Sequence, residues 1–118
     1  MWRSKYNAKK ITTSDGTFDS KKEYNRWLVL KDMESKGEIS ELKRQIKFEL
    51  LPKQILIEPR VKKGRKQKCE LPVSYIADFT YKQNGDFIVE DAKGMRTPEY
   101  TLKRKLMKFL LDIEVQEV

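Results

Sequence analysis

An Asn84-Gly85 dipeptide between two runs of β-branched and aromatic residues is the feature that most constrains how this chain folds. Asn-Gly in this setting is the strongest short-range signal for a two-residue type I′ turn. The sequence therefore predicts a β-hairpin whose strands cover about residues 72–81 and 86–93. A two-residue turn also sets one register for the hairpin, so positions on the two strands can be matched.

Counting outward from the turn places Asp78 directly opposite Asp91. Side chains alternate between the two faces of a strand, so Lys93 shares the face of Asp91. Two carboxylates and an ammonium group are thus expected on one patch, whereas Glu90 should point to the opposite face.

Two neighbouring carboxylates are costly unless something neutralises them. At about 5 Å they repel by roughly 3 kcal/mol when the effective dielectric constant is near 20. A divalent cation is the obvious neutralising group. The alternative is that Asp78 is an exposed strand residue and that Asp91 and Lys93 form an ordinary surface ion pair, which contributes little to stability.

Length and composition narrow the possible classes. The 118 residues are enough for one compact domain, so residues 1–118 are expected to form a single unit. The lone cysteine, Cys69, cannot form an intrachain disulfide, which fits a reducing cytoplasmic setting. Histidine is absent, which excludes histidine general bases, HNH-type nucleases and zinc sites with histidine ligands. No run is apolar for long enough to predict a membrane span.

The net charge of +8 is concentrated in one segment. An expected loop at 59–69 holds six basic residues and no acid, whereas the rest of the chain carries 20 basic and 18 acidic residues. Charge focused in this way favours a DNA backbone as partner, and the alternative is a solvated loop. The residues expected to contact nucleic acid there are Lys62, Lys63, Arg65, Lys66 and Lys68. Residues 1–18, which interleave aromatic and basic side chains, are expected to form a basic arm that is irregular or contains a short strand, with a turn at Asp15-Gly16.

A helix is expected to begin after Asp19 or Ser20 and to end near Ser35, with Gly37 as its left-handed C-terminal cap. Glu23 lies in the first turn of this helix, on a largely apolar stripe. It can reach the acidic patch of the hairpin, or it can form a capping box with Ser20 and merely satisfy a backbone amide. The sequence leaves both roles open.

A second helix is expected from Thr97-Pro98, which is a capping hydroxyl followed by proline at the first helical position, to about Leu111. Its expected buried stripe consists of Leu102, Leu106, Phe109 and Leu110. Its other faces carry four cations that either follow a phosphate backbone or lie on a solvated face: Lys103, Arg104, Lys105 and Lys108.

The remaining segments indicate strands. Residues 45–51 alternate between apolar and polar, residues 54–58 can form another strand, and residues 113–118 close the chain as a short one. The order is therefore helix, three or more strands, helix, strand. It predicts an α/β fold in which helices flank a mixed β-sheet.

The acidic patch holds the groups that metal-dependent phosphodiester hydrolysis needs. Asp78 and Asp91 would be direct ligands of Mg²⁺ or Mn²⁺, with the backbone carbonyl of Ala92 as a further ligand. Lys93 would lie beside the attacking water and counter negative charge in the transition state. Glu23 would enter from the helix, either as a ligand or through a water molecule.

This constellation resembles the PD-(D/E)XK nuclease superfamily, in which one core strand carries an acid and the next carries an acid-x-lysine triplet. Ile76-Ala77-Asp78-Phe79 matches the first strand and Asp91-Ala92-Lys93 matches the triplet. Glu23 corresponds to the helix glutamate of many members. Alanine stands before the first acid in place of proline, which matters little because only the acid binds metal. The expected element order is that of the restriction-endonuclease-like core.

The resemblance extends to a family of short phage and prophage proteins that are regarded as candidate endonucleases of this superfamily. The segments that carry it are Ser4-Lys5-Tyr6-Asn7-Ala8, Phe18-Asp19-Ser20-Lys21-Lys22-Glu23, Tyr75-Ile76-Ala77-Asp78-Phe79 and Val89-Glu90-Asp91-Ala92-Lys93-Gly94. It implies a metal-dependent DNA endonuclease in the cytoplasm of a bacterial host. It also implies a role in phage DNA processing, on branched DNA such as a Holliday junction during recombination.

Two other functions fit the same residues. One is a nucleic-acid-binding module without catalysis, and the other is a subunit of a recombination or transposition complex that cuts only with its partners. A junction resolvase makes two symmetric cuts and would act as a homodimer. The sequence does not distinguish a junction, flap, nick, linear duplex or RNA as substrate.

Overall fold

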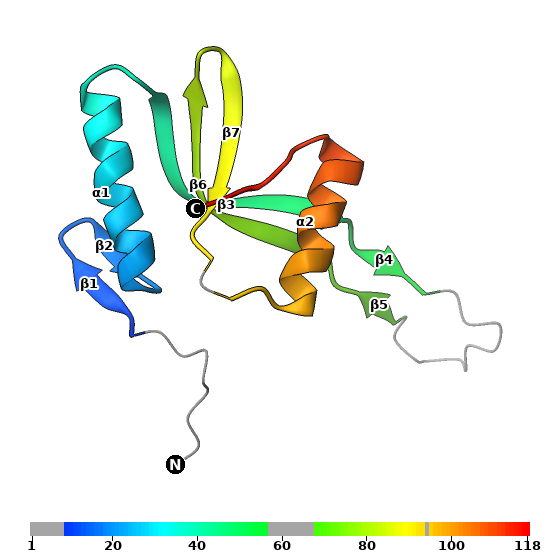
Figure 1. The fold of residues 1–118 in the computed structure, drawn as a ribbon. Helices are drawn as coiled ribbons and strands as arrows, with labels where there is room; N and C mark the ends of the chain where they lie inside the picture. Colours follow the sequence, from blue (N-terminus) through cyan, green and yellow to red (C-terminus); the bar gives the residue numbers. More distant parts are fainter. Residues whose placement is uncertain (1–8, 57–67, 94) are drawn as a thin grey trace.

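The computed structural model describes residues 9–56, 68–93 and 95–118. Its helices and strands are β1 Ile11–Thr13, β2 Gly16–Phe18, α1 Lys21–Ser35, β3 Ser40–Leu51, β4 Gln54–Ile55, β5 Cys69–Glu70, β6 Val73–Gln83, β7 Asp86–Asp91, α2 Pro98–Leu111 and β8 Gln116–Glu117. The centre is a four-stranded sheet in the order β3-β6-β7-β8, with the two helices packed beside it (Figure 1). Two short strand pairs, β1–β2 and β4–β5, extend from it.

The central sheet is mixed, as the sequence predicts. Strand β6 is antiparallel to both of its neighbours, β3 and β7, whereas β8 is parallel to β7. Parallel neighbours need a crossover connection, and α2 provides it. The fold is therefore the predicted mixed α/β arrangement, and it is consistent with a restriction-endonuclease-like core.

The β6–β7 hairpin has the predicted turn and register. Both turn residues, Asn84-Gly85, have positive φ, 52° and 84°, as a type I′ turn requires. The paired residues run outward from the turn to Phe79 and Glu90. The next pair in this register is Asp78 and Asp91, so the facing carboxylates follow directly from the turn.

Helix α1 begins and ends where the sequence predicts. The Ser20 hydroxyl accepts a hydrogen bond from the Glu23 N–H at 3.1 Å, which caps the first turn. Gly37 has φ of 77°, and its N–H donates to the Glu34 carbonyl at 3.0 Å. Glycine takes this left-handed conformation without steric cost, so it ends the helix.

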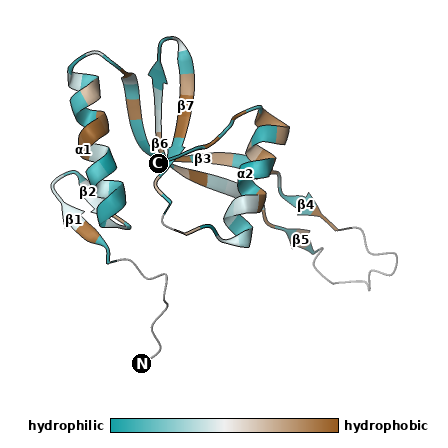
Figure 2. Cartoon of the chain, viewed as in Figure 1, coloured by the Kyte–Doolittle hydropathy of each residue, from teal (hydrophilic) through white to brown (hydrophobic). Residues whose placement is uncertain are grey.

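Buried apolar side chains form two clusters, one under each helix. The cluster under α1 consists of Leu30, Ile39, Phe79 and Tyr81. The cluster under α2 consists of Leu50, Tyr75, Ala77, Val89, Tyr100 and Met107. Strand β6 contributes to both clusters because β3 and β6 change direction near their midpoints (Figure 1). Hydrophobic and hydrophilic residues alternate along these strands, as expected for half-buried strands (Figure 2).

Helix α2 has the predicted start. The Thr97 hydroxyl accepts a hydrogen bond from the Tyr100 N–H at 3.1 Å, and Pro98 is the first helical residue. A hydroxyl cap satisfies one of the backbone N–H groups that a helix start leaves without a partner, and proline suits the first helical position. The end at Leu111 is also as predicted.

The predicted buried stripe of α2 is wrong. Phe109 is 84% exposed and Leu102 58%, Leu110 is also exposed, and only Leu106 packs partly against the core. The buried residues of this helix are Tyr100 and Met107, which are seven positions apart. The reason is tertiary, because Tyr100 and Met107 pack into the cluster with Tyr75 and Val89, and Arg104 on the same face pairs with Glu117 of β8 at 2.7 Å.

The β1–β2 hairpin is more regular than the arm predicted for residues 1–18, although a short strand and a turn at Asp15-Gly16 are part of that prediction. Residues 11–18 form this hairpin, and residues 1–8 lie outside the described residues. Arg44 of β3 fastens it, since its guanidinium donates to the Thr17 carbonyl at 2.9 Å and lies 3.7 Å from the centroid of the Phe18 ring. A cation over an aromatic face adds an attraction that is independent of hydrogen bonding.

The β4–β5 pair brackets the basic loop predicted at 59–69 and projects beyond α2 (Figure 1). Most of that loop, residues 57–67 with Lys62, Lys63, Arg65 and Lys66, lies outside the described residues. Lys68 is described, and its carbonyl accepts a hydrogen bond from the Leu56 N–H at 3.0 Å. Neither helix in the described ranges has the length and hydropathy that a bilayer crossing requires.

Candidate active site

The carboxyl groups of Asp78 and Asp91 meet at the bend of the sheet, close enough for Asp78 to shift the pKa of Asp91. Asp78 Oδ2 accepts a hydrogen bond from the backbone N–H of Ala92 at 2.9 Å. Across the sheet, Gln45 of β3 lies opposite Asp78 and has a φ of 53°. A positive φ is uncommon for a residue with a side chain, and such strained positions cluster at functional sites. The bend thus brings the predicted pair of acids together.

Asp91 is completely buried. Its Oδ2 accepts a hydrogen bond from the Tyr75 hydroxyl, whereas Oδ1 has no hydrogen-bond partner among the described residues. Burial, followed by the hydrogen bond with Asp78 and the charge of Asp78, raises the pKa of Asp91 to about 7. Buried polar atoms are nearly always paired, and perturbed acids gather at functional sites, so this carboxyl is a strong candidate for a functional group.

Tyr75 is the hydrogen-bond donor to Asp91 Oδ2. Burial, followed by the hydrogen bond to Asp91, raises the pKa of Tyr75. Its hydroxyl therefore keeps its proton under all ordinary conditions. A donor fixed on Oδ2 determines which oxygen of Asp91 is left for another ligand.

Lys93 lies on the same patch, as the strand alternation predicts. Its Nζ is 3.6 Å from Asp91 Oδ1 and 4.6 Å from the centroid of the Tyr100 ring. Its carbonyl accepts a hydrogen bond from Lys22 Nζ at 2.9 Å, which ties the segment after β7 to α1. The side chain is 30% exposed, so its ammonium group lies between a buried acid and solvent.

The sequence left two roles open for Glu23, a helix cap and a member of the acidic patch, and its contacts fit part of each. Its Oε2 accepts a hydrogen bond from the Asp19 N–H at 3.0 Å, so it satisfies a backbone amide at the helix start. Its Oε1 accepts from Gln45 Nε2, also at 3.0 Å. Burial, followed by the charge of Asp78, raises the pKa of Glu23. The residue is therefore a cap that lies within electrostatic reach of the two aspartates.

The chemistry of the two aspartates fits a hard divalent cation. Mg²⁺ and Mn²⁺ prefer carboxylate and carbonyl oxygens, and Asp91 Oδ1 is a buried carboxylate oxygen without a hydrogen-bond donor in the described ranges. No arrangement of three or more acidic, cysteine or histidine side chains suited to a metal ion occurs within residues 9–56, 68–93 and 95–118. Asp78 and Asp91 are thus the two side chains among these residues that could hold an ion at this site.

Glu90 belongs to a different network on the other side of the strand. Arg26 of α1 binds its carboxylate with two hydrogen bonds, at 2.8 and 2.7 Å, and the Tyr81 hydroxyl donates to it as well. Burial, followed by this bond, raises the pKa of Tyr81 to about 12. The network locks α1 to β7 immediately behind the aspartate pair, which is the placement that strand alternation predicts for Glu90.

The cations of α2 that were expected to face DNA have different surroundings. Arg104 is paired with Glu117, and Lys108 Nζ lies 2.8 Å from Asp112 and 3.4 Å from Glu114. Lys105 is exposed. The pairs of Lys108 are on the surface and exchange easily, whereas the Arg104 pair holds α2 to β8.

Two residues of the site are not predicted by the sequence, Tyr75 and Gln45. Tyr75 has the pattern of an apolar strand residue, and Gln45 that of an exposed one. Their roles depend on contacts with Asp91 and Glu23, which are far away in the chain. The signal that could have pointed to Tyr75 is its hydroxyl, since a buried tyrosine usually needs an acceptor.

Comparison with known proteins identifies the family. A family model described as "Protein of unknown function (DUF1064)" matches residues 3–116. The chain belongs to the DUF1064 family. No curated protein and no solved structure matches it. The DUF1064 match spans all the site residues described above, so the site lies within the family's shared region.

Proposed function

We propose that this DUF1064 protein is a divalent-metal-dependent endonuclease that hydrolyses DNA phosphodiester bonds. The observation that supports it most is the surroundings of Asp91 Oδ1. This buried oxygen has no hydrogen bond among the described residues, while its carboxyl contacts Asp78 and the Lys93 ammonium lies 3.6 Å away. A buried acid with an oxygen that lacks a hydrogen bond destabilises the fold, which argues that a function requires this acid.

In this proposal Asp78 and Asp91 hold Mg²⁺ or Mn²⁺, with the Ala92 carbonyl and Glu23 as additional oxygen donors. The ion, when bound, supplies a nucleophilic water and neutralises charge on the phosphate. Tyr75 keeps Oδ2 of Asp91 occupied, which leaves Oδ1 for the ion.

Lys93 is the one cation of the site whose ammonium group lies between Asp91 and solvent. In the proposal it donates a hydrogen bond to an oxygen of the attacked phosphate and orients the attacking water. Its charge offsets the negative charge that develops on the phosphate, which is the kind of stabilisation that fixed charges give best in a partly buried site. The ring of Tyr100, 4.6 Å away, restricts where the ammonium group can move.

The proposed substrate is branched phage DNA, which the superfamily resemblance implies. Two symmetric cuts in a four-way junction would need two copies of the chain, so the proposal includes a homodimer on DNA. The proposed setting is the cytoplasm of a bacterial host.

The test is cleavage of a panel of four-way, flap, nicked and linear DNA, with an RNA duplex beside them, in Mg²⁺ or Mn²⁺. Asp91→Asn and Lys93→Met should each lower the cleavage rate by at least about 100-fold, the usual cost of removing one preorganised group. Both variants should still bind DNA in a chelator, because neither change removes the basic loop. Thermal unfolding with Mn²⁺ should show stabilisation of the wild type and none of Asp78→Asn.

Asp86→Asn is the matched control, because Asp86 is an exposed acid on the same strand as Asp91. It should cut like the wild type. Cleavage by Asp91→Asn at the wild-type rate contradicts the proposal. Steep salt-dependent DNA binding, with no cleavage of any substrate in either metal, would support the non-catalytic module instead.

A further inference from the structure

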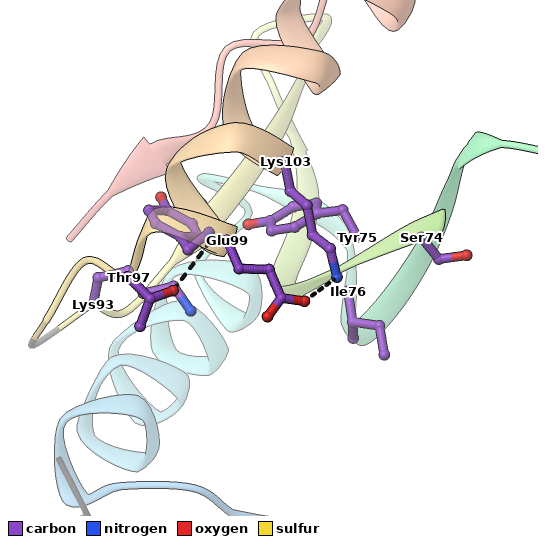
Figure 3. Close-up of a pocket in the computed structure, with 8 residues that line it drawn as sticks. Ser74, Tyr75, Ile76, Lys93, Thr97, Glu99 and Lys103 are labelled. Carbon is purple, nitrogen blue, oxygen red and sulfur yellow. Dashed lines mark hydrogen bonds and ion pairs between the residues drawn. The ribbon is translucent and has the colours of Figure 1, made fainter. Parts of the chain in front are cut away.

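A pocket of about 260 Å³ lies beside the carboxylates, where the first turns of α2 face the first half of β6 (Figure 3). Tyr75 and Lys93 line it, and both also contact Asp91. A group that occupies the pocket is therefore next to whatever is bound at Asp91. The pocket continues the carboxylate site and is not a separate cavity.

The pocket lining is chemically suited to an anion. Two ammonium groups reach it from different segments, Lys93 from the chain after β7 and Lys103 from α2 (Figure 3). The hydroxyls of Ser74 and Thr97 also line it, and Thr97 marks the start of α2, where backbone N–H groups favour negative charge. Lysine and hydroxyl groups together are typical contacts of a DNA phosphate.

One acid, Glu99, also lines the pocket, and its pairing with Lys103 determines its effect on an anion there. Its carboxylate lies 3.0 Å from Lys103 Nζ, one helical turn away, and is 77% exposed, whereas Lys103 is only 26% exposed. An exposed pair of this spacing is weak, so Lys103 can exchange Glu99 for a stronger acceptor. Glu99 thus holds Lys103 over the pocket while no ligand is bound.

We propose that this pocket binds a phosphodiester group next to the scissile one on the cleaved DNA strand, with Lys103 as its principal contact. The proposal rests on the endonuclease function proposed above, because it takes Asp91 as the reacting centre. Lys103 leaves Glu99 and pairs with the phosphate, so a DNA contact replaces an intrahelical one. The rings of Tyr75 and Tyr100 form the inner wall and restrict the strand to one path past Lys93.

The experiment measures DNA binding of the full chain in a chelator, with a fluorescently labelled 20-base-pair duplex, across a range of salt concentrations. Lys103→Gln should weaken binding about tenfold and lower the slope of log affinity against log salt by about 1, as expected when one phosphate contact is lost. Glu99→Gln should strengthen binding severalfold because it releases Lys103. Lys103→Arg keeps the charge and should bind like the wild type, which separates loss of contact from misfolding.

The chain offers a matched control pair at the far end of α1. Asp32 and Lys36 have the same spacing and lie 2.9 Å apart, and neither lines the pocket. Asp32→Asn and Lys36→Gln therefore report the effect of net charge alone. If Lys103→Gln binds like Lys36→Gln, or Glu99→Gln like Asp32→Asn, the pocket does not hold a phosphate.

Cleavage separates this proposal from the one on which it rests. In an active protein, Lys103→Gln should raise KM and leave kcat nearly unchanged, because the contact is made before and during the reaction. Binding that depends on Lys103 in a protein that never cuts would overturn the nuclease and keep the phosphate pocket. Cleavage by Lys103→Gln with the wild-type KM would keep the nuclease and overturn the phosphate pocket.

Discussion

Each carboxylate of the site has one oxygen held by a donor from its own surroundings. Tyr75 donates to Asp91, the Ala92 N–H donates to Asp78, and the Asp19 N–H donates to Glu23. These bonds orient the three acids, while the cations that pair with them among the described residues are Lys93, 3.6 Å from Asp91, and Arg44, 3.7 Å from Glu23. At the scale of single residues, the acids of the site are therefore held in position, but the site has less positive than negative charge.

This shortage predicts a dependence of stability on pH. The pKa of Asp91 is raised from 3.8 to about 7, so the metal-free folded protein binds a proton that the unfolded chain has already lost. Its contribution is complete below pH 3.8 and disappears as the pH rises through about 7. We expect the free energy of unfolding in urea to fall between about pH 4 and 7, by about 1.4 kcal/mol for each unit of the shift. Asp91→Asn should remove most of this fall.

Glu23 changes stability in the same direction, since its pKa is raised too. The acids whose pKa is lowered, Asp15, Asp112 and Glu117, change stability in the opposite direction at the acidic end of this window, so the fall is measured most cleanly as the pH approaches 7. Mg²⁺ should oppose the fall, because it replaces the lost proton. A flat profile for the wild type in chelator would show that Asp91 ionises normally.

Among the elements, β3 has the most unusual conformation. Gln45 lies in mid-strand with a φ of 53°, opposite Asp78, and its amide donates to Glu23 Oε1. The left-handed conformation costs a residue with a side chain about 1 kcal/mol or more. The strand thus carries backbone strain at the point where it reaches the site and connects the two clusters of the core.

The backbone strain at Gln45 predicts that the glycine variant is more stable than the alanine variant, which is the reverse of the usual order in a strand. Gln45→Gly should be more stable than Gln45→Ala by about 0.5–1 kcal/mol, because glycine accepts positive φ and alanine does not. Both variants should cut more slowly, since both lose the contact with Glu23. Thermal unfolding of the two proteins measures the first effect and the cleavage assay the second.

Lys47 provides the control on the same strand, because it is exposed and its φ is not positive. There alanine should be more stable than glycine, as in an ordinary strand. An alanine variant at Gln45 that is more stable than the glycine variant would mean that the strand is unstrained at the site.

The whole molecule has a net charge of +8, and six of its basic residues lie within the sequence segment 60–68. The paired strands β4 and β5, which precede and follow this segment in the chain, lie on the side of α2 that is farther from α1 (Figure 1). The described part of the site is itself acidic, with Glu23, Asp78 and Asp91 around Lys93. In the proposed function the basic segment binds DNA and the carboxylates carry out the chemistry, so the two roles can be tested separately.

Neutralising the basic loop should weaken DNA binding without changing the chemical step. The variant replaces Lys62, Lys63, Arg65 and Lys66 with glutamine. If all four contact phosphates, the slope of log affinity against log salt should fall by about 3 to 4, for all DNA sequences alike. The control neutralises four exposed lysines elsewhere: Lys36, Lys43, Lys47 and Lys82. Equal slopes for the two variants would show that the loop is not the docking surface.

Local signals were enough for the parts of the fold that depend on neighbours in the chain. The Asn84-Gly85 turn determines the register of the hairpin and thereby places Asp78 opposite Asp91. Ser20 and Thr97 determine where the helices begin. These features follow from backbone dihedral angles, strand alternation and caps, which act over a few residues.

Only the tertiary structure decided which face of α2 is buried, how Glu23 is bonded, and that Tyr75 and Gln45 belong to the site. The apolar stripe with Phe109 is typical of a core face, yet another face, with Tyr100 and Met107, packs into the core. Each of these outcomes depends on contacts between segments that are distant in sequence. Periodicity shows which residues share a face, but it cannot show what another element places against that face.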